Sequence, residues 1–302
     1  MPQERLGVVY GALAYFVWGL LPLYWRLLEP ASALEILAHR FLWSLVVVLA
    51  ILAVMRHWRW TRDLRHRPKA MLAVSLAAVV IAGNWAVYIW AVNDGHVVEA
   101  SLGYFINPIV TVCLGVLVLR ERLRPGQWVA VGTAAAAVVV LTVDYGRLPW
   151  IALVLGLTFA AYGLIKKLAG VPAIEGLAVE TAVLVVPAFA YVLVLESNGE
   201  AVFGHEGLGH AALLACAGLA TALPLLSFGA AARRIPLSLL GLLQYIAPSL
   251  QFLLGVVVFS EPMPPVRLVG FALVWCALVM FTTESLTVRR RRVRQLAMQP
   301  AG

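Results

Sequence analysis

Charged residues are scarce in this chain. Of its 302 residues only 13% are Asp, Glu, Lys or Arg, whereas 62% are hydrophobic. A water-soluble protein of this length could not keep so much apolar surface away from water. The composition therefore argues against an ordinary soluble domain and favours a protein that lies in a membrane.

Cysteine and the familiar reactive motifs are also scarce. The three cysteines, Cys113, Cys216 and Cys276, lack metal-ligand spacing and an evident disulfide partner, so we interpret them as small packing residues. We find no metal-binding His/Glu motif, no Gly-rich phosphate loop and no serine nucleophile elbow. The sequence therefore predicts no catalytic residue, no metal and no cofactor, and the missing phosphate loop argues against an ATP-driven pump.

Long apolar runs, by contrast, are abundant. A run of about 20 residues crosses the hydrocarbon core as a helix, and backbone groups in lipid need partners within their own segment. The alternating pattern of a membrane barrel is absent. The first run lacks an early small-residue cleavage site, so we expect it to be retained. We predict ten membrane-spanning helices: residues 6–28, 33–55, 70–92, 98–119, 126–143, 149–167, 173–195, 210–231, 237–259 and 266–284.

Basic residues fall mainly into alternate connections between these helices. With a cytoplasmic N-terminus, the opposite side contains little beyond Arg147 and Arg267. The positive-inside rule therefore predicts that both termini are cytoplasmic. Because the basic residues stand at helix ends and in a short tail, the net charge of +8 does not indicate nucleic-acid binding.

The two halves of the chain are related by an internal repeat. Residues 99–141 align with residues 239–281 at a constant offset of 140, and the identical pairs include Pro108/Pro248, Gly115/Gly255 and Glu121/Glu261. Five helices separate equivalent positions, so the second copy must face the opposite way, as in many secondary transporters. We predict a first five-helix repeat at 6–143, an inverted second repeat at 149–284, and a basic cytoplasmic tail at 285–302.

Ionisable residues within a predicted span are candidates for function because they are costly in lipid. Glu35, His39 and Arg40 lie in the predicted helix 33–55, and Glu180 lies in 173–195. The offset of 140 makes Arg40 equivalent to Glu180. We hypothesise that these two residues approach each other, or a shared substrate, near a central cavity. An ion pair that only packs helices is an equally strong alternative.

His39 shares a helix face with Glu35 because the two are four residues apart. One interpretation is a histidine that relays protons under the influence of the carboxylate. The other, which we favour, is a hydrogen-bonded histidine near the outer end of the helix.

A stripe of small and polar residues follows one face of helix 98–119, and its repeat counterpart follows 237–259. The matched prolines Pro108 and Pro248 free a carbonyl and permit a bend, which suits a helix that lines a cavity. Tight packing through small residues is the competing interpretation. Within these two helices we choose polar candidates for substrate contact, namely Tyr104, Asn107, Gln244 and Tyr245.

The predicted helix 70–92 adds an aromatic and amide set. Asn84 and Tyr88 share a face, as do Trp85 and Tyr88. Such a lining suits a flat, amphipathic organic substrate. Asn84, Trp85 and Tyr88 therefore join the candidates for substrate contact.

Several runs resemble a known family. The chain is similar to the EamA-type branch of the drug/metabolite transporter superfamily, and more closely to its RarD-like group, over nearly its whole length. The runs that carry the likeness are residues 14–19 (AYFVWG), 35–40 (EILAHR), 83–85 (GNW), 90–93 (WAVN), 99–108 (EASLGYFINP) and 244–248 (QYIAP). The resemblance implies ten helices, cytoplasmic termini, a central cavity between the repeats and a place in the bacterial inner membrane. It supplies no agreed set of site residues.

These features together predict a secondary transporter that exports small organic drugs or metabolites by alternating access. Its expected partners are a small organic substrate and membrane lipid, and proton coupling would make transport collapse with a protonophore. Chloramphenicol-type compounds are included because the RarD-like group is commonly labelled chloramphenicol-sensitive. Export of amino acids, with drug efflux incidental, is the alternative within transport. A membrane-embedded enzyme or lipid-handling protein, and a scaffold or sensor that moves no solute, are alternatives from other classes. The sequence does not specify the oligomeric state.

Overall fold

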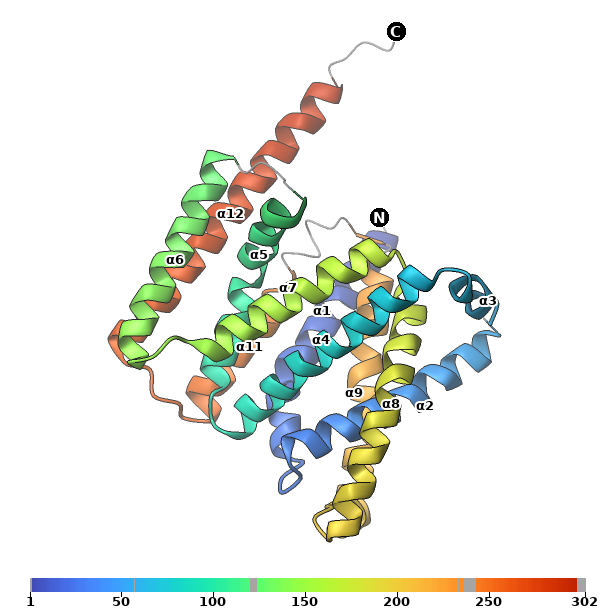
Figure 1. The fold of residues 1–302 in the computed structure, drawn as a ribbon. Helices are drawn as coiled ribbons and strands as arrows, with labels where there is room; N and C mark the ends of the chain where they lie inside the picture. Colours follow the sequence, from blue (N-terminus) through green and yellow to red (C-terminus); the bar gives the residue numbers. More distant parts are fainter. Residues whose placement is uncertain (1, 57, 120–123, 233, 236–242, 298–302) are drawn as a thin grey trace.

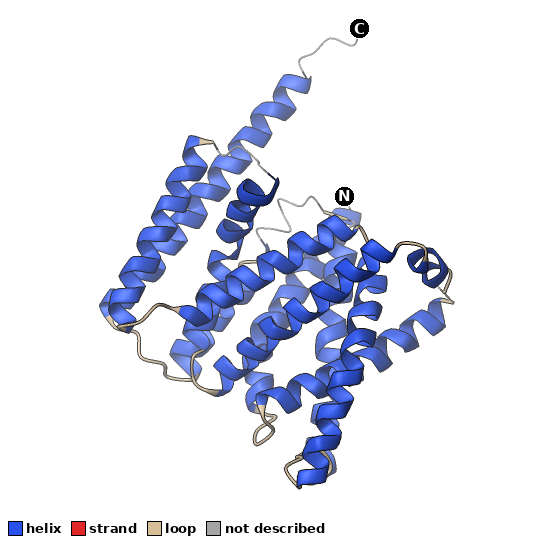
Figure 2. Cartoon of the chain, in the orientation of Figure 1, coloured by secondary structure: helices blue, strands red, loops and turns tan. Residues whose placement is uncertain are grey.

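The computed structural model of the chain describes residues 2–56, 58–119, 124–232, 234–235 and 243–297. Throughout these ranges the regular structure is helical, and no strand occurs in them (Figure 2). The predicted all-α class is thus confirmed for the part of the chain that the structure describes.

The helices begin close to the predicted positions, because the apolar runs set where a helix can lie in lipid. Their bounds are α1 Pro2–Arg26, α2 Ala33–Met55, α3 Trp60–Arg65, α4 Pro68–Asn93, α5 Val97–Leu119, α6 Pro125–Tyr145, α7 Trp150–Ala169, α8 Ala173–Asn198, α9 Gly207–Ala232, α11 Ile246–Leu253, η1 Leu254–Val258 and α12 Pro265–Ala297. By length and composition, seven of the described helices can cross a membrane, and shorter apolar stretches lie within α5 (Val97–Thr111), within α7 (Trp150–Lys166) and over α11 and η1 (Ile246–Val258). The chain is therefore a multi-pass membrane protein.

The helix ends have local causes. Ser32 caps α2, because its hydroxyl oxygen accepts a hydrogen bond from the Glu35 amide at 3.2 Å. Gly146 and Gly170 end α6 and α7 in the left-handed conformation, with φ of 64° and 59°, which glycine adopts without strain.

Three features differ from the sequence predictions. The short helix α3 lies in the connection that we expected to be a loop, and η1 is a π-helical turn that no pattern indicated. Helix α12 continues to Ala297, beyond the predicted end at residue 284. Pro248 lies in the first turn of α11, directly after a turn at residues 244–245, and the bend that we expected inside a helix stays a prediction at this position. Pro108 does lie inside α5. Part of the predicted helix 237–259 and Glu121 lie outside the described residues.

The described helices pack around four apolar clusters, of which two are large. The larger one is centred on α1, α2 and α4 and includes the fully buried Trp25 and Ile36. The smaller one joins α5 and α6 to α12, with Phe105 packed edge-on against Phe271. The outer surface exposes many large apolar side chains, such as Val54, as expected for a surface that faces lipid.

The arrangement in space brings distant segments together. Helix α7 lies beside α4, and α12 lies beside α6 (Figure 1). The N-terminus and the C-terminal end of α12 lie toward the same side of the bundle, and α12 projects beyond it (Figure 1). We call the opposite side, where residues 27–32, 94–96, 146–149, 199–206 and 260–264 connect the helices, the Glu261 side.

Candidate functional site

Arg40 lies at the centre of the larger apolar cluster. It is the eighth residue of α2, and its side chain is buried, with 3% of the residue exposed. Its Nε donates a hydrogen bond to Thr221 Oγ1 of α9 at 2.8 Å. The Thr221 hydroxyl in turn donates to the carbonyl of Ala217. One neutral hydroxyl is therefore the hydrogen-bond partner of this guanidinium among the described residues.

Aromatic rings surround the same guanidinium. Its Cζ lies 3.5 Å from the centroid of the Trp85 ring and 5.3 Å from that of Trp25. Phe41 stacks behind Trp85 with the ring centroids 5.8 Å apart. Cation–π contacts of this kind stabilise a charge that water does not reach, without neutralising it. The Trp25 indole Nε1 is itself buried with no acceptor in the described part of the chain.

Tyr88, Tyr104 and Asn84 extend the cluster from α4 to α5. The rings of Tyr88 and Tyr104 meet edge to face at 5.5 Å, and both tyrosines lie within electrostatic range of Arg40. The Tyr104 hydroxyl donates to Asn84 Oδ1 at 3.4 Å. The Asn84 amide donates to Thr158 Oγ1 at 2.8 Å and to the Leu155 carbonyl at 3.0 Å. Sequence reasoning thus chose four aromatic and amide residues that the structure brings together with Arg40.

Glu180 does not pair with Arg40, so this part of our hypothesis is wrong. Its carboxylate lies 2.7 Å from Lys166 Nζ and accepts a hydrogen bond from the Tyr162 hydroxyl at 3.1 Å. Lys166 also donates to Tyr162 at 3.1 Å, which closes a three-membered network between α7 and α8. The reason is proximity along the fold: the lysine lies near the C-terminal end of α7, one short connection before the start of α8.

Glu35 and His39 occupy the first turns of α2 but do not act on each other. Glu35 Oε1 accepts hydrogen bonds from the Val202 and Phe203 amides at 2.8 and 3.1 Å. His39 stacks on Phe203 with the ring centroids 4.5 Å apart, and neither ring nitrogen has a hydrogen-bond partner within the described ranges. Both earlier interpretations of His39 needed a polar partner, and the described part of the chain supplies none.

Among the described residues, no hydrogen bond or ring contact joins the remaining candidates to Arg40. Asn107 is buried in α5, and its Oδ1 has no partner among the residues that the structure describes. Gln244 is half-buried in the turn before α11. Tyr245 packs in the smaller cluster, near Thr282 of α12. These three residues therefore do not join the aromatic cluster.

Carboxylates tie helix ends together on the Glu261 side. Glu261 accepts hydrogen bonds from the Val97 and Val98 amides at 2.6 and 2.9 Å, at the start of α5, where a negative charge also suits the helix dipole. Burial raises the pKa of Glu261 above its ordinary value, although the two amide hydrogen bonds act in the opposite direction. Glu99 pairs with Arg147 at 2.9 Å and accepts from the Ile151 amide at the start of α7. These ties hold helices in place, and neither carboxylate forms an ion pair with Arg40.

Sequence reasoning missed several residues. Thr221, Trp25 and Gln251 contribute to the central cluster, where Gln251 Nε2 donates to the Trp18 carbonyl at 3.2 Å. Nothing in their own spacing marks them, since a threonine or a tryptophan in an apolar helix is common. Lys166 lies within the predicted helix 149–167, and its place four residues after Tyr162 was the available signal for the contact between them.

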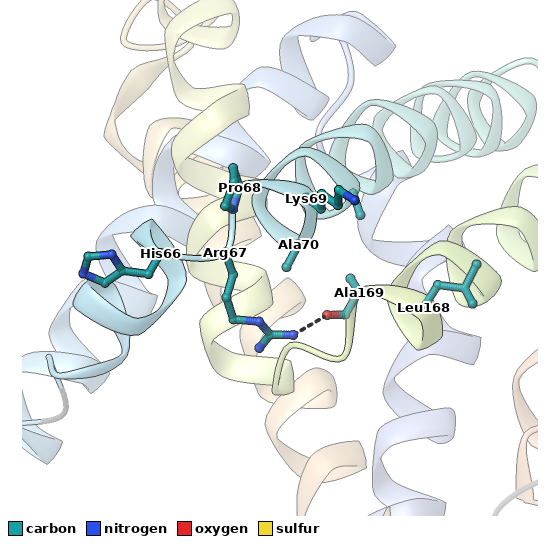
Figure 3. Close-up of a pocket in the computed structure, with 8 residues that line it drawn as sticks. His66, Arg67, Pro68, Lys69, Ala70, Leu168 and Ala169 are labelled. Carbon is teal, nitrogen blue, oxygen red and sulfur yellow. Dashed lines mark hydrogen bonds between the residues drawn. The ribbon is translucent and has the colours of Figure 1, made fainter.

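A pocket elsewhere on the surface holds none of the candidate residues. It lies between the start of α4 and the end of α7 and is lined by His66, Arg67, Lys69 and Leu168, among others (Figure 3). Arg67 Nη2 donates across it to the Ala169 carbonyl at 3.2 Å, which satisfies a helix end (Figure 3). This hydrogen bond therefore holds the end of α7 against the start of α4.

Known proteins resemble this chain over its whole length. A sequence profile described as the EamA-like transporter family matches residues 5–143. Protein RarD of Streptomyces exfoliatus is 56% identical over 299 residues, which cover 99% of this chain and 95% of that protein. The chain belongs to the EamA-like transporter family. The resemblance of the chain to the RarD-like group, which we found in its sequence, is thus confirmed.

Other members of the family agree. An uncharacterized transporter of Bacillus subtilis, YojE, is 44% identical and covers 95% of this chain and 97% of its own. Protein RarD of Salmonella typhi is 42% identical, with 96% and 99% covered. A solved structure, described only as the crystal structure of a protein, is similar with a TM-score of 0.55 at 19% identity, covering 91% of this chain and 96% of its own. At that identity the likeness concerns the fold alone. Members named as transporters indicate a membrane transporter.

Proposed function

We propose that this EamA-family protein is a secondary transporter that exports small organic drugs or metabolites across the bacterial inner membrane by alternating access. One repeat-related bundle moves against the other around a central site near the midplane. Arg40, Trp85, Tyr88 and Tyr104 form that site. An ion gradient, in the simplest case of protons, or the substrate gradient itself supplies the driving force.

The proposal includes ten spans in two inverted repeats, residues 6–143 and 149–284, with both termini and the tail 285–302 in the cytoplasm. The matched positions of Arg40 and Glu180 support it: each is the eighth residue of its helix, α2 or α8. The start of α1 and the end of α12, which lie toward the same side of the bundle, also support it (Figure 1). In this orientation the Glu261 side faces outward, and its Arg147 and Arg267 are each paired with a carboxylate.

The observation that carries the proposal is the buried guanidinium of Arg40 among aromatic rings. An ionised group within a span is retained where it serves a substrate or ion pathway. Here the group has a hydroxyl and two indole rings as neighbours and no carboxylate within 4.0 Å among the described residues. A structural ion pair, the strongest alternative, would require such a carboxylate. Arg40 therefore holds a polar or charged group of the substrate, and the rings contact its apolar part.

Glu180 has a separate role in this proposal. Its pairing with Lys166 and Tyr162 lies toward the cytoplasmic ends of α7 and α8. Proton uptake by Glu180 would break the pair and release α7 from α8, which is the kind of step that couples a proton to a change of access. His39, without a partner for its ring nitrogens, takes no part in this network.

Export of small organic molecules is tested by untargeted mass spectrometry of cells and medium, with cells that express the wild type compared with cells that carry an empty vector. We expect at least one compound, a chloramphenicol-type drug or an amino acid among the candidates, to accumulate outside only with the wild type. Loss of that accumulation with a protonophore would support proton coupling. A scaffold or sensor would move no compound although it inserts normally, and that result would overturn the proposal.

A further inference from the structure

We infer that the substrate of the central site is an organic monoanion whose carboxylate takes up the charge of Arg40. This inference rests on the proposed function and narrows it to one chemical class. It depends on the charge balance around Arg40, on the groups of the guanidinium that are already occupied, and on the rings beside it.

The charge of Arg40 is uncompensated within the described chain. The side chain lies in the interior of a membrane-spanning bundle, and an isolated cation in such a medium is strongly disfavoured. Trp85 and Trp25 attract the cation through their ring faces but carry no charge. A carboxylate that binds there would supply the missing negative charge through strong, charge-assisted hydrogen bonds.

One negative charge from the substrate would balance the positive charge of the site. The half-buried Lys166 is neutralised by Glu180, and Arg26 is paired with Glu29 at 3.2 Å. A dianion such as a phosphate monoester would therefore bring one charge too many. A cation would meet Arg40 without a carboxylate to bind it, and a neutral molecule would leave the guanidinium unpaired.

The geometry of Arg40 leaves a carboxylate-binding edge. Thr221 occupies Nε, and Trp85 covers one face of the guanidinium at stacking distance. The hydrogen bond that Arg40 makes to a described residue comes from Nε, and the two Nη groups together form the fork that binds a carboxylate with two parallel bonds. The Trp25 ring, whose buried Nε1 has no acceptor among the described residues, lies with its centroid 5.3 Å from Arg40 Cζ.

The neighbouring rings define the rest of the substrate. The rings of Tyr88 and Tyr104 lie beside Arg40 and bring two uncharged hydroxyls with them, and no ion pair among the described residues places a carboxylate there to bind an ammonium group. A free amino acid, which is a zwitterion, would therefore leave its ammonium group poorly bound. The inferred class is an apolar or aromatic skeleton with one carboxylate and no positive charge.

The inference is tested by ligand-induced thermal stabilisation of the purified full-length protein in lipid nanodiscs. Four charge forms of one skeleton serve as probes: N-acetylphenylalanine (anion), its amide (neutral), phenylalanine (zwitterion) and phenylalanine amide (cation). The same four forms of leucine and tryptophan vary the apolar part. We expect the anions to raise the melting temperature in a concentration-dependent way, because a ligand that binds only the folded state stabilises it. The other three forms should bind at least about tenfold more weakly.

Variants separate charge from structure. Arg40→Gln should abolish the preference for the anion, whereas Arg40→Lys keeps the charge without the planar fork and should retain part of it. Thr221→Val keeps the charge of Arg40 and replaces Arg40→Gln if that variant fails to fold. It should weaken binding of the anion, while the protein should still bind the anion more tightly than the amide. Arg26→Gln, at a half-buried arginine that is paired with Glu29 and lies over the Phe259 ring, is the control for loss of a positive charge elsewhere and should leave the preference for the anion unchanged.

Three results would overturn the inference: equal or stronger stabilisation by an amide or amine form, an anion effect that survives Arg40→Gln, or no stabilisation by any anion. The proposed export function fails separately. If a neutral compound such as chloramphenicol accumulated outside cells and this accumulation required Arg40, the proposed export function would hold, but the inference of a monoanionic substrate would be contradicted. If anions bound but no compound were exported, the inference about binding would hold and the proposed export function would fail.

Discussion

At the scale of single residues, the central feature is one arginine held by uncharged groups. Arg40 itself could be identified from the sequence, because a charged residue within an apolar run is unusual. Its partners were not visible, because Thr221 and Trp25 come from other helices and their residue types are ordinary in apolar segments. The same limit explains why we paired Arg40 with Glu180: the repeat shows which positions are equivalent, but not which side chains meet.

Thr221 provides the first prediction at this scale. Thr221→Val removes the acceptor of Arg40 Nε and keeps nearly the same side-chain volume. A hydrogen bond to a charged group contributes about 1.5–3 kcal/mol, so we expect export to fall roughly tenfold while the protein still inserts. The measurement is the rate of substrate efflux per inserted molecule, with Ser197→Ala, at an exposed serine, as the control. An unchanged rate would show that the position of Arg40 does not depend on Thr221.

The pair of Lys166 and Glu180 provides the second. Lys166→Met or Glu180→Gln alone leaves a buried charge unpaired, and each should lower the free energy of unfolding by about 3 kcal/mol. The double variant should recover much of this loss, because neither charge then remains. Thermal unfolding in detergent measures the cycle. Recovery of stability without recovery of proton-driven export would assign the pair to coupling, whereas recovery of both would make it structural only.

At the scale of helices, close contacts place the site. A Cβ atom on Gly218 of α9 would lie 2.5 Å from the Trp43 carbonyl oxygen and closer still to its carbonyl carbon, so α9 can approach α2 only because this residue has no side chain. The contact lies one turn from Thr221 and therefore fixes the distance between Thr221 and Arg40. The sequence showed many glycines in apolar helices, but not which of them meets a neighbouring backbone.

Gly218→Ala tests this contact. Since backbone atoms cannot move aside as a flexible side chain would, we expect a loss of about 1–3 kcal/mol of stability and reduced export. Gly132→Ala is the control, because a Cβ there meets no atom within 4 Å and alanine favours a helix. Melting temperatures of the two variants give the comparison. Equal melting temperatures would mean that α2 and α9 separate without cost.

The helices themselves were predictable for a physical reason. Lipid requires long apolar segments with internal hydrogen bonds, so composition alone placed the starts of α2, α5 and α12 within one residue. The exceptions are α3 and η1, where local backbone geometry and not hydrophobicity sets the structure. Pro248 shows the same limit, because a proline pattern cannot tell the first turn of a helix from its middle.

At the scale of the whole molecule, the proposal places the Glu261 side outside the cell. We expect a single cysteine at Glu206→Cys to react with an impermeant maleimide in intact cells, and one at Arg62→Cys to react only after permeabilisation. Both substitutions are made after replacement of Cys113, Cys216 and Cys276 by alanine, and both positions are exposed. The opposite labelling pattern would invert the topology, and labelling of both sites in intact cells would contradict a single orientation.

The central claim is that substrate crosses the membrane through the site around Arg40, and counterflow in proteoliposomes tests it most directly. Vesicles that contain purified wild type are loaded with the unlabelled export substrate and diluted into labelled substrate. We predict a transient accumulation of label inside for the wild type and Arg26→Gln, and none for Arg40→Gln at equal protein content. Counterflow that persists in Arg40→Gln, or that is absent from the wild type, would contradict the account.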